Sequence, residues 1–297
     1  MSNEISLSSA TRTNLLSLQN TTNLIGVTQQ RLATGLKVNN ALDDALAFFR
    51  ARNLNSRAED LSAIKDQING GVSVLTAATQ GLESMESVLK QMKAIAQSAI
   101  SAPESTTRAK LASQFNELRT QVDAIAFDSS FNGVNLLKND PGHFRGGADQ
   151  MTVKFNERTD PKQVNQLLIS GLKASDYKSI MATSAVTVGT AGSTVVWGQT
   201  GTAAIRAITA AISAIDSALV TVRQSAQQFG TNASMLQIRA DFTTNIINTL
   251  KGGASELVNA DLNEESANLL SLQTRQQLGT ISLSIAQRSE QSILRLF

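Results

Sequence analysis

The chain of 297 residues contains no cysteine and only one histidine, His143. The absence of cysteine excludes disulfides, thiolate metal ligands and thiol nucleophiles. One histidine cannot supply a two- or three-histidine zinc site, and His143 lies in a loop rich in Gly and Pro, where a solvated side chain is the ordinary case. No phosphate-loop, dinucleotide-binding or His-Glu-x-x-His motif occurs. We therefore expect no catalytic residues, no metal and no cofactor, and hence no enzyme.

The chain also lacks clustered charge. It carries 26 Lys and Arg against 24 Asp and Glu, for a net charge of +2, and the basic residues never form a run. This pattern does not support binding to nucleic acid or to an anionic membrane. The N-terminal residues do not combine a basic region with a continuous apolar segment, so we expect no cleavable secretory signal there. No stretch approaches the roughly 18 apolar residues that a membrane span requires.

Aromatic residues make up 4% of the chain and proline occurs three times, whereas Ala, Leu, Ile, Ser, Thr, Asn and Gln dominate. In residues 259–297 the apolar side chains recur at helical spacing and form one stripe. The stripe consists of Ala267, Leu270, Leu278, Ile281, Ile285, Ile293 and Leu296. Asp261 and Glu264 have the spacing of a capping box at the start of this helix. Its remaining residues are neutral and polar rather than charged, so we expect another surface to cover them.

A second helix with the same composition is predicted over residues 5–36, with a narrow seam of Leu18, Ile25 and Leu32 at sevenfold spacing. It could be a solvated helix of weak stability, because Ser, Thr and Asn are mediocre helix formers. We favour pairing of the two ends of the chain, since each apolar seam needs a partner and neither is expected to be stable alone.

Between the ends, the sequence predicts a connector at 34–42 and a long helix from there to about residue 100, with Asp43 and Asp44 at its start. Gly70 and Gly71 lie inside this helix, so it either bends or is closely approached there. A capping box of Ser101 and Glu104 starts a further helix to about residue 127. Another helix begins near residue 202 and is expected to break at 252–253, where two glycines follow each other.

The middle of the chain has a different period. Met151, Val153 and Phe155 alternate with polar residues, which predicts a strand, and residues 185–197 contain two further β-rich runs. The predicted fold is mainly α: long antiparallel helical rods, a terminal two-helix coiled coil and a small β-containing module inserted mid-chain. The expected domains are 1–36 with 260–297, 37–137 with 202–259, and 138–201.

Several segments together resemble the bacterial flagellins. They are RLATGLKVNNALDDA (31–45), FNGVNLL (131–137), the stretch from FTTNIINTLKGG to ISLSIA (242–286) and the terminal ILRLF. With the patterns around them they cover roughly three quarters of the chain and omit the middle. The resemblance implies a structural subunit that self-assembles into the extracellular flagellar filament for motility and is exported unfolded by the flagellar type III apparatus. The implied partners are other copies, an export chaperone, the filament cap and hook-associated proteins.

The resemblance also implies roles for particular parts of the chain. The two ends would form an inner coiled-coil domain, the rods the next shell, and 138–201 a module facing outward. The inner tube would be packed by Leu18, Ile25, Leu32, Leu270, Leu278, Ile281, Ile285 and Leu296. Residues 131–137 would begin a β-hairpin at the outer edge of the shell.

Two departures from the family pattern stand out. The middle of the chain, 138–201, is short compared with the large outer domains of many flagellins. In flagellins sensed by an innate immune receptor the first rod carries Arg-Val-Arg-Glu-Leu, whereas residues 90–95 here read KQMKAI, so we expect weak or no receptor activation. A hook–filament junction protein of the same superfamily and a surface adhesin are the alternative functions. A flagellin scaffold displaying an enzyme is not supported, because 138–201 contains no metalloprotease motif.

Overall fold

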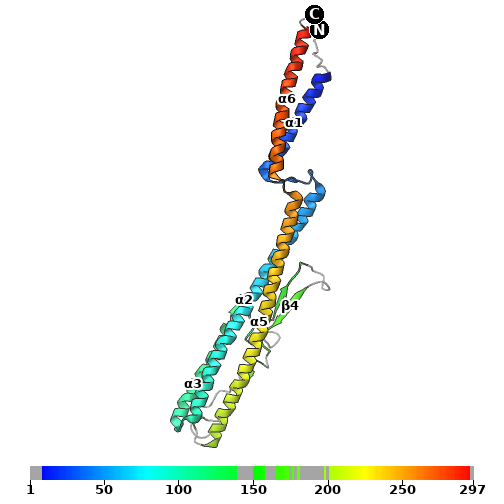
Figure 1. Cartoon of the computed structure of the whole chain (residues 1–297). Helices are drawn as coiled ribbons and strands as arrows, with labels where there is room; N and C mark the ends of the chain where they lie inside the picture. The colour runs from blue at the N-terminus through cyan, green and yellow to red at the C-terminus, as the bar shows by residue number, and fades with distance from the viewer. Residues whose placement is uncertain are drawn as a thin grey trace. The chain divides into compact units, whose positions relative to one another are not determined.

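The computed structural model describes residues 9–138, 150–157, 165–173, 176, 179–180, 197–198 and 201–294. The chain divides into two compact units, Met1–Ala58 with Asn248–Phe297, and Glu59–Ile247. The described residues are mainly helical and include two small antiparallel sheets, which confirms the predicted fold class (Figure 1). The predicted division into three domains stays a prediction.

In the first unit, α1 (Ser9–Thr34) and α6 (Leu262–Leu294) lie side by side (Figure 1). This confirms that the two ends of the chain pair. Helix α6 begins as predicted, because the Asp261 carboxylate accepts hydrogen bonds from the backbone N–H groups of Asn263 at 2.8 Å and Glu264 at 3.4 Å. These two donors would otherwise be unsatisfied in the first turn.

The connectors that leave α1 and enter α6 are hydrogen-bonded to each other. Gly35 ends α1 with φ 70°, and its carbonyl accepts a hydrogen bond from Ala260 N–H at 2.9 Å. Lys37 N–H donates to the Val258 carbonyl at 2.7 Å, and Leu36 and Asn259 form an isolated antiparallel β-bridge. The predicted connector is therefore present, and backbone hydrogen bonds join it to the segment that links α5 to α6.

The two longest helices are α2 (Ala45–Ser101) and α5 (Thr202–Val258). The Asp44 carboxylate accepts a hydrogen bond from Ala47 N–H at 2.9 Å, as expected for a helix start. The predicted break of α5 at 252–253 is wrong, because the helix continues to Val258. A Cβ at Gly253 would lie 3.8 Å from Leu54 Cδ1, so this glycine faces the first turns of α2, and packing outweighs the roughly 1 kcal/mol that each glycine costs a helix.

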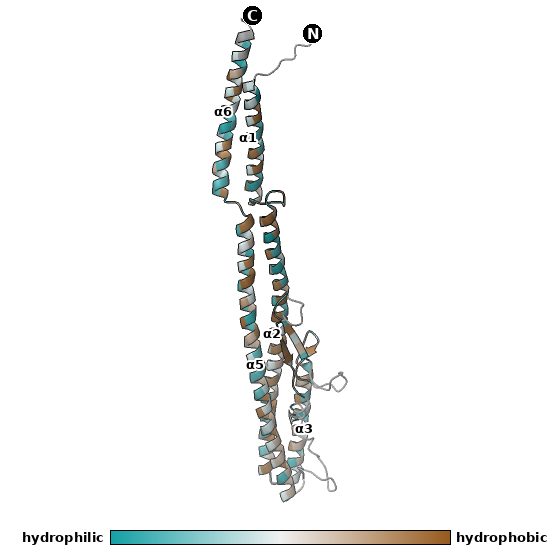
Figure 2. Ribbon diagram, turned by 90° about the vertical axis from the view of Figure 1, so that its right-hand side faces the viewer, coloured by the Kyte–Doolittle hydropathy of each residue, from teal (hydrophilic) through white to brown (hydrophobic). Residues whose placement is uncertain are grey.

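In the second unit α2, α5 and α3 (Ser105–Asp128) lie side by side (Figures 1 and 2). Ion pairs join Glu86 to Arg223 and Lys93 to Asp216, so α2 and α5 run antiparallel, as predicted. The core between the helices is apolar and fully buried. It includes Leu75, Leu82, Met85, Leu89, Met92, Phe115, Ile208, Ile215 and Leu236.

The predicted capping box before α3 is wrong. Ser101 is the last residue of α2, and its hydroxyl donates to the Gln97 carbonyl at 3.4 Å, one turn back in the same helix. The residue that caps α3 is Glu104, whose side chain makes no capping hydrogen bond. The motif failed because α2 continues to Ser101, which leaves that side chain inside one helix instead of at the start of the next.

Strands β1 (Ser130–Phe131) and β2 (Val134–Asn135) form the hairpin that the sequence resemblance implied. Its two turn residues, Asn132 and Gly133, have φ values of 50° and 79°. A turn with positive φ at both central positions matches the twist of the flanking strands, and Asn-Gly tolerates it best. That this hairpin lies at the outer edge of a shell stays a prediction.

Strands β3 (Gln150–Lys154) and β4 (Gln166–Ser170) form a second antiparallel hairpin. Strand β3 is the one predicted from alternation, whereas β4 was not predicted. A Cβ at Gly71 would lie 3.0 Å from Val153 Cγ2 and 3.1 Å from Leu236 Cδ1, so α2 does not break at this glycine but is closely approached. The β-rich runs predicted at 185–197 lie outside the described residues, except Trp197, which is buried against Phe115 with the ring centroids 4.9 Å apart.

Candidate assembly interface

The surface between α1 and α6 combines small, polar and aliphatic side chains at coiled-coil spacing. On α1 the buried residues that follow this spacing are Thr11, Thr21, Ile25 and Thr28. On α6 the buried or half-buried residues at steps of three and four are Glu265, Leu269, Leu272, Gln276, Gly279 and Leu283. Its large apolar residues, Ile25 on α1 and Leu269, Leu272 and Leu283 on α6, alternate with polar and small ones, so the seam buries less apolar area than an all-leucine coiled coil would.

Leu18 and Gly279 make the closest approach in this seam. A Cβ at position 279 would lie 2.8 Å from Leu18 Cδ2, a separation that real Cβ atoms do not show. Glycine therefore leaves room for the Leu18 side chain as it is placed here, and a methyl group would force that side chain to shift. Leu18 and Ile25, which the sequence analysis selected, do face α6, and Leu32 is half-buried.

An ion pair closes the seam at the end near the connectors. Arg31 Nη1 donates to Glu265 Oε1 at 3.0 Å, and the side chains are 35% and 9% exposed. Removing Arg31 would leave the Glu265 carboxylate poorly solvated and unpaired. A weaker polar contact lies farther along, where Gln276 Nε2 donates to Thr22 Oγ1 at 3.3 Å.

The apolar stripe predicted on α6 lies on the face that points away from α1. Leu270 is 67% exposed, Leu278 63%, Ile281 56% and Ile285 63%, and Leu296 lies outside the described residues. Only Leu278 lies near the predicted partners, because it lines a groove between the two helices together with Leu18. Their packing in an inner tube stays a prediction. The seam that does face α1 escaped notice because Glu265, Gln276 and Gly279 interrupt it, although its alternating steps of four and three were readable.

Helix α1 has the same arrangement, with exposed apolar residues opposite the seam. Leu16 and Val27 lie there, and the exposed Leu15 and Leu24 flank the seam. We call these residues, with Leu270, Leu278, Ile281 and Ile285, the outer faces of α1 and α6. Figure 2 accordingly shows hydrophobic and hydrophilic turns mixed along both helices. Large apolar side chains gathered outside the seam mark a surface for association.

The segment that corresponds to the receptor motif lies on α2, where its cations are engaged within the chain. Lys90 pairs with Glu86 at 2.9 Å, and Glu86 also accepts from Arg223 Nη2 at 2.9 Å. These hydrogen bonds, from Lys90 first and Arg223 second, lower the pKa of Glu86 below its ordinary value of 4.5. Lys93 pairs with Asp216. Met92, which lies between the two lysines in the sequence, is fully buried.

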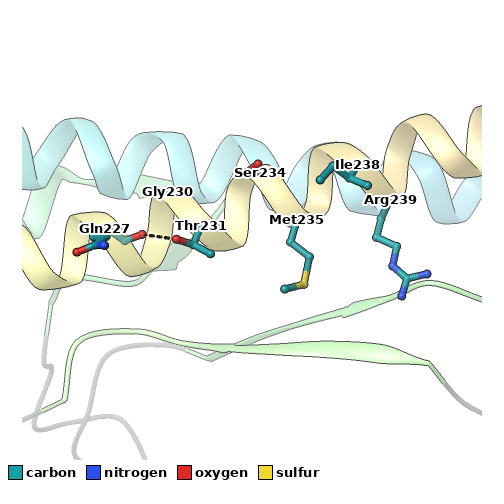
Figure 3. Close-up of a pocket in the computed structure, with 7 residues that line it drawn as sticks. All are labelled: Gln227, Gly230, Thr231, Ser234, Met235, Ile238 and Arg239. Carbon is teal, nitrogen blue, oxygen red and sulfur yellow. Dashed lines mark hydrogen bonds between the residues drawn. The ribbon is translucent and has the colours of Figure 1, made fainter.

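No group of three or more His, Cys, Asp or Glu side chains among the described residues could hold a metal ion. A shallow groove of about 620 Å³ is lined by a single helix, α5, and contains no acid and base pair (Figure 3). Contrary to the expectation from sequence, α5 is long and apolar enough to cross a membrane by length and composition alone; 28% of its most apolar stretch is buried.

Comparisons with known proteins agree on one family. Residues 3–140 match the bacterial flagellin N-terminal helical region, and residues 212–297 match the C-terminal helical region. The chain is 32% identical over 297 residues to flagellin FljO of Caulobacter vibrioides, covering 99% of this chain and 98% of that protein. It is 33% identical to flagellin FljM of the same organism at the same coverage, and 28% identical to flagellin C of Rhizobium meliloti over 91% of each chain.

The crystal structure of Bacillus cereus flagellin aligns with a TM-score of 0.45 at 17% identity, over 60% of this chain and 88% of that one. The assignment rests on the sequence matches, which span both helical regions and nearly the full length of the Caulobacter proteins. An exposed apolar face on each terminal helix is what a subunit of a polymer would carry. The chain belongs to the bacterial flagellin family of structural proteins.

Proposed function

We propose that this chain is the repeating subunit of an extracellular flagellar filament, and that its terminal helices bind neighbouring copies through their outer faces. The observation that carries the proposal is the exposure of four large apolar residues along α6, each between 56% and 67% exposed. Nothing within the described part of the chain covers them. Filament formation supplies many identical neighbours that could.

The energetics favour folding of the terminal helices together with assembly. A Leu or Ile side chain that becomes fully buried contributes roughly 1.5–3 kcal/mol. The seam between α1 and α6 mixes Thr, Gln and Gly with Leu and Ile, and a further set of large apolar residues lies exposed on the outer faces. Because helices with few tertiary contacts are only marginally stable, burial between copies would stabilise both the helices and the polymer.

We extend this proposal to the architecture of the subunit. Residues 1–36 and 260–297 would form the inner domain, 37–137 with 202–259 the rod domain, and 138–201 the outward-facing module. Leu18, Ile25 and Leu32 would pack within each subunit, whereas Leu270, Leu278, Ile281, Ile285 and Leu296 would pack between subunits. The seam and the exposed outer faces support this assignment.

Export and partners belong to the same proposal. The chain would be exported unfolded by the type III apparatus, with a chaperone, the filament cap and hook-associated proteins as partners. Family membership supports these roles, and so do apolar faces that need cover before assembly. No observation favours the junction-protein or adhesin alternative, since the similar proteins named above are flagellins that match nearly end to end.

Deletion of residues 278–297 tests the proposal. We expect the truncated chain to keep a folded helical rod by circular dichroism but to form no filaments when sheared filament fragments are added as seeds. The double variant Ile281→Gln, Ile285→Gln should weaken polymerisation without shortening the chain, and Gln273→Ala, an exposed polar position on the same helix, serves as its control. Filaments of normal length from the truncation would refute the proposal.

A further inference from the structure

Two ion pairs join α2 to α5, and they repeat with a period of seven residues. Glu86 pairs with Arg223, and Lys93 pairs with Asp216. The paired residues are seven apart on each helix, so the two pairs are separated by one heptad, or about 10 Å along the axis. Each helix carries an acid followed by a base, and because the helices run antiparallel, each acid meets a base.

The buried core between α2 and α5 repeats with the same period. Every seventh residue of α2 from Leu61 to Ala96 is buried, and so is every seventh residue of α5 from Ile208 to Thr243. Apart from Ala96 and Thr243, all of these residues are Leu, Ile, Val or Phe. A shift of one helix by one heptad would therefore bring similar apolar side chains together again, so this core alone selects the native alignment poorly.

The shape of the core selects the alignment more strongly in one place than in another. A Cβ at Gly71 would lie 3.1 Å from Leu236 Cδ1, and a shift by one heptad would bring a larger residue of α2 to this position. Beside the ion pairs, the buried residues of α2 are Met85 and Met92, whose flexible side chains fit several shapes. In that part of the rod, charge distinguishes the alignments better than shape does.

The charges oppose a shift by one heptad in either direction. In one direction Glu86 would come opposite Asp216. In the other direction Lys93 would come opposite Arg223. Either shift replaces two attractive contacts by one repulsive contact. The pair of Glu86 with Lys90 lies within α2, so it is present in every alignment and selects none of them. The side chains of Glu86 and Lys93 are 23% and 32% exposed, so water screens the repulsion only in part.

We propose that these two ion pairs lock the register of α2 against α5, because their order of signs excludes the shifted alignments that the repeating core would accept. Two acids on one helix and two bases on the other would form the same number of ion pairs in the native alignment. They would also form an ion pair after a shift by one heptad. The order of the signs, and not only the number of pairs, therefore specifies the alignment. This inference concerns the fold of the monomer and does not depend on the proposed filament function.

Exchange of the charges within one pair tests the lock. Lys93→Glu with Asp216→Lys keeps an ion pair at this position and leaves the net charge unchanged, but α2 then carries two acids and α5 two bases. A shift by one heptad then brings an acid opposite a base. Glu83→Lys with Arg206→Glu exchanges charges at exposed positions outside the two pairs and is the matched control.

Pairs of introduced cysteines report the alignment, because the chain has no cysteine of its own. Thr79 and Gly230 lie one heptad beyond the pair of Glu86 and Arg223, so Thr79→Cys with Gly230→Cys reports the native alignment. Thr79→Cys with Gln237→Cys reports an alignment shifted by one heptad. A bismaleimide with a reach below about 10 Å, added while the monomer refolds from urea, links only cysteines at the same level of the rod. Single-cysteine variants give the background from links between chains.

With the native charges, we expect the native reporter to be linked and the shifted reporter to stay at background. The exchange at Lys93 and Asp216 should raise linking of the shifted reporter by about fivefold or more, because a repulsive contact becomes attractive. The control exchange should leave it at background.

Two results would overturn the proposal. One is a shifted reporter that stays at background in an exchange variant that folds, as shown by circular dichroism and by its native reporter. The other is linking of the shifted reporter with the native charges, since no lock would then operate. If the exchange variant does not fold, Lys93→Gln with Asp216→Gln replaces it. Removal of the repulsion alone should then raise linking of the shifted reporter by about twofold or more, and an unchanged value would count against the lock.

Discussion

Gly81 and Gly230 are both inside helices of the second unit, yet their surroundings differ. A Cβ at Gly81 would collide with the hydroxyl of Ser129 and lie 2.7 Å from Leu137 Cδ1. The Ser129 hydroxyl is held in place, because it donates to the Ile125 carbonyl at 2.6 Å where α3 ends. At Gly230 the corresponding space is empty. The same residue type thus serves close packing at one position and only weakens the helix at the other.

Substitution by alanine should therefore have opposite effects at the two glycines. Gly81→Ala should lower the free energy of unfolding by about 1–3 kcal/mol, because the new methyl overpacks the contact with α3 and its hairpin. Gly230→Ala should raise the free energy by about 0.5–1 kcal/mol, since alanine is the better helix former. Urea unfolding of the monomer, followed by circular dichroism, measures both. Equal shifts would contradict the close approach at Gly81.

At the scale of the elements, α6 is a helix with two working faces. One face carries a seam of alternating leucine, polar and small residues toward α1, and the other carries Leu270, Leu278, Ile281 and Ile285 outward. Because similar leucine side chains recur along the inner seam at steps of three and four, apolar contacts alone distinguish poorly between alternative alignments of the two helices. A single buried polar interaction can set alignment in a coiled coil. Here the pair of Arg31 and Glu265 is placed to do so.

Breaking this ion pair should weaken assembly through misalignment of α1 and α6. Glu265→Gln or Arg31→Ala should cost about 1–3 kcal/mol, less than a fully buried pair because Arg31 is 35% exposed. Exchange of the two residues, Arg31→Glu with Glu265→Arg, should restore part of the loss. The critical concentration for polymerisation is the measurement, and Arg12→Ala, exposed on α1, is the control. An exchange variant no better than the single variants would argue against a role in alignment.

The sequence predicted best those elements whose apolar residues recur at a regular period. Helices with a full apolar face, such as α2, α3 and most of α5, were readable because burial imposes a 3.6-residue period. The seam of α6 toward α1 was not, since Glu265 and Gly279 occupy positions where the period calls for large apolar residues. The break expected at 252–253 failed because packing overrode glycine's low helix propensity. Strand β4 is stabilised by its pairing with β3, which no local pattern reveals.

At the scale of the whole molecule, the chain departs from flagellins that an innate immune receptor senses. Its KQMKAI segment lacks the Arg-Val-Arg-Glu-Leu pattern, and Lys90 and Lys93 are paired with Glu86 and Asp216. We expect weak or no activation by the purified monomer in a receptor reporter assay. A flagellin that carries the pattern provides the positive control. A strong response from this chain would show that recognition rests on other residues.

The hydrogen-bonded connectors that follow α1 and precede α6 have a mechanical consequence. A lone peptide segment can rotate about each φ and ψ, so it transmits little torque. Here the segment around Gly35 and Lys37 is hydrogen-bonded to the segment around Val258 and Ala260, and neither can turn without breaking backbone hydrogen bonds. The two hydrogen-bonded segments therefore resist torsion as one unit, and a twist applied to α1 is shared with the segment that leads into α6.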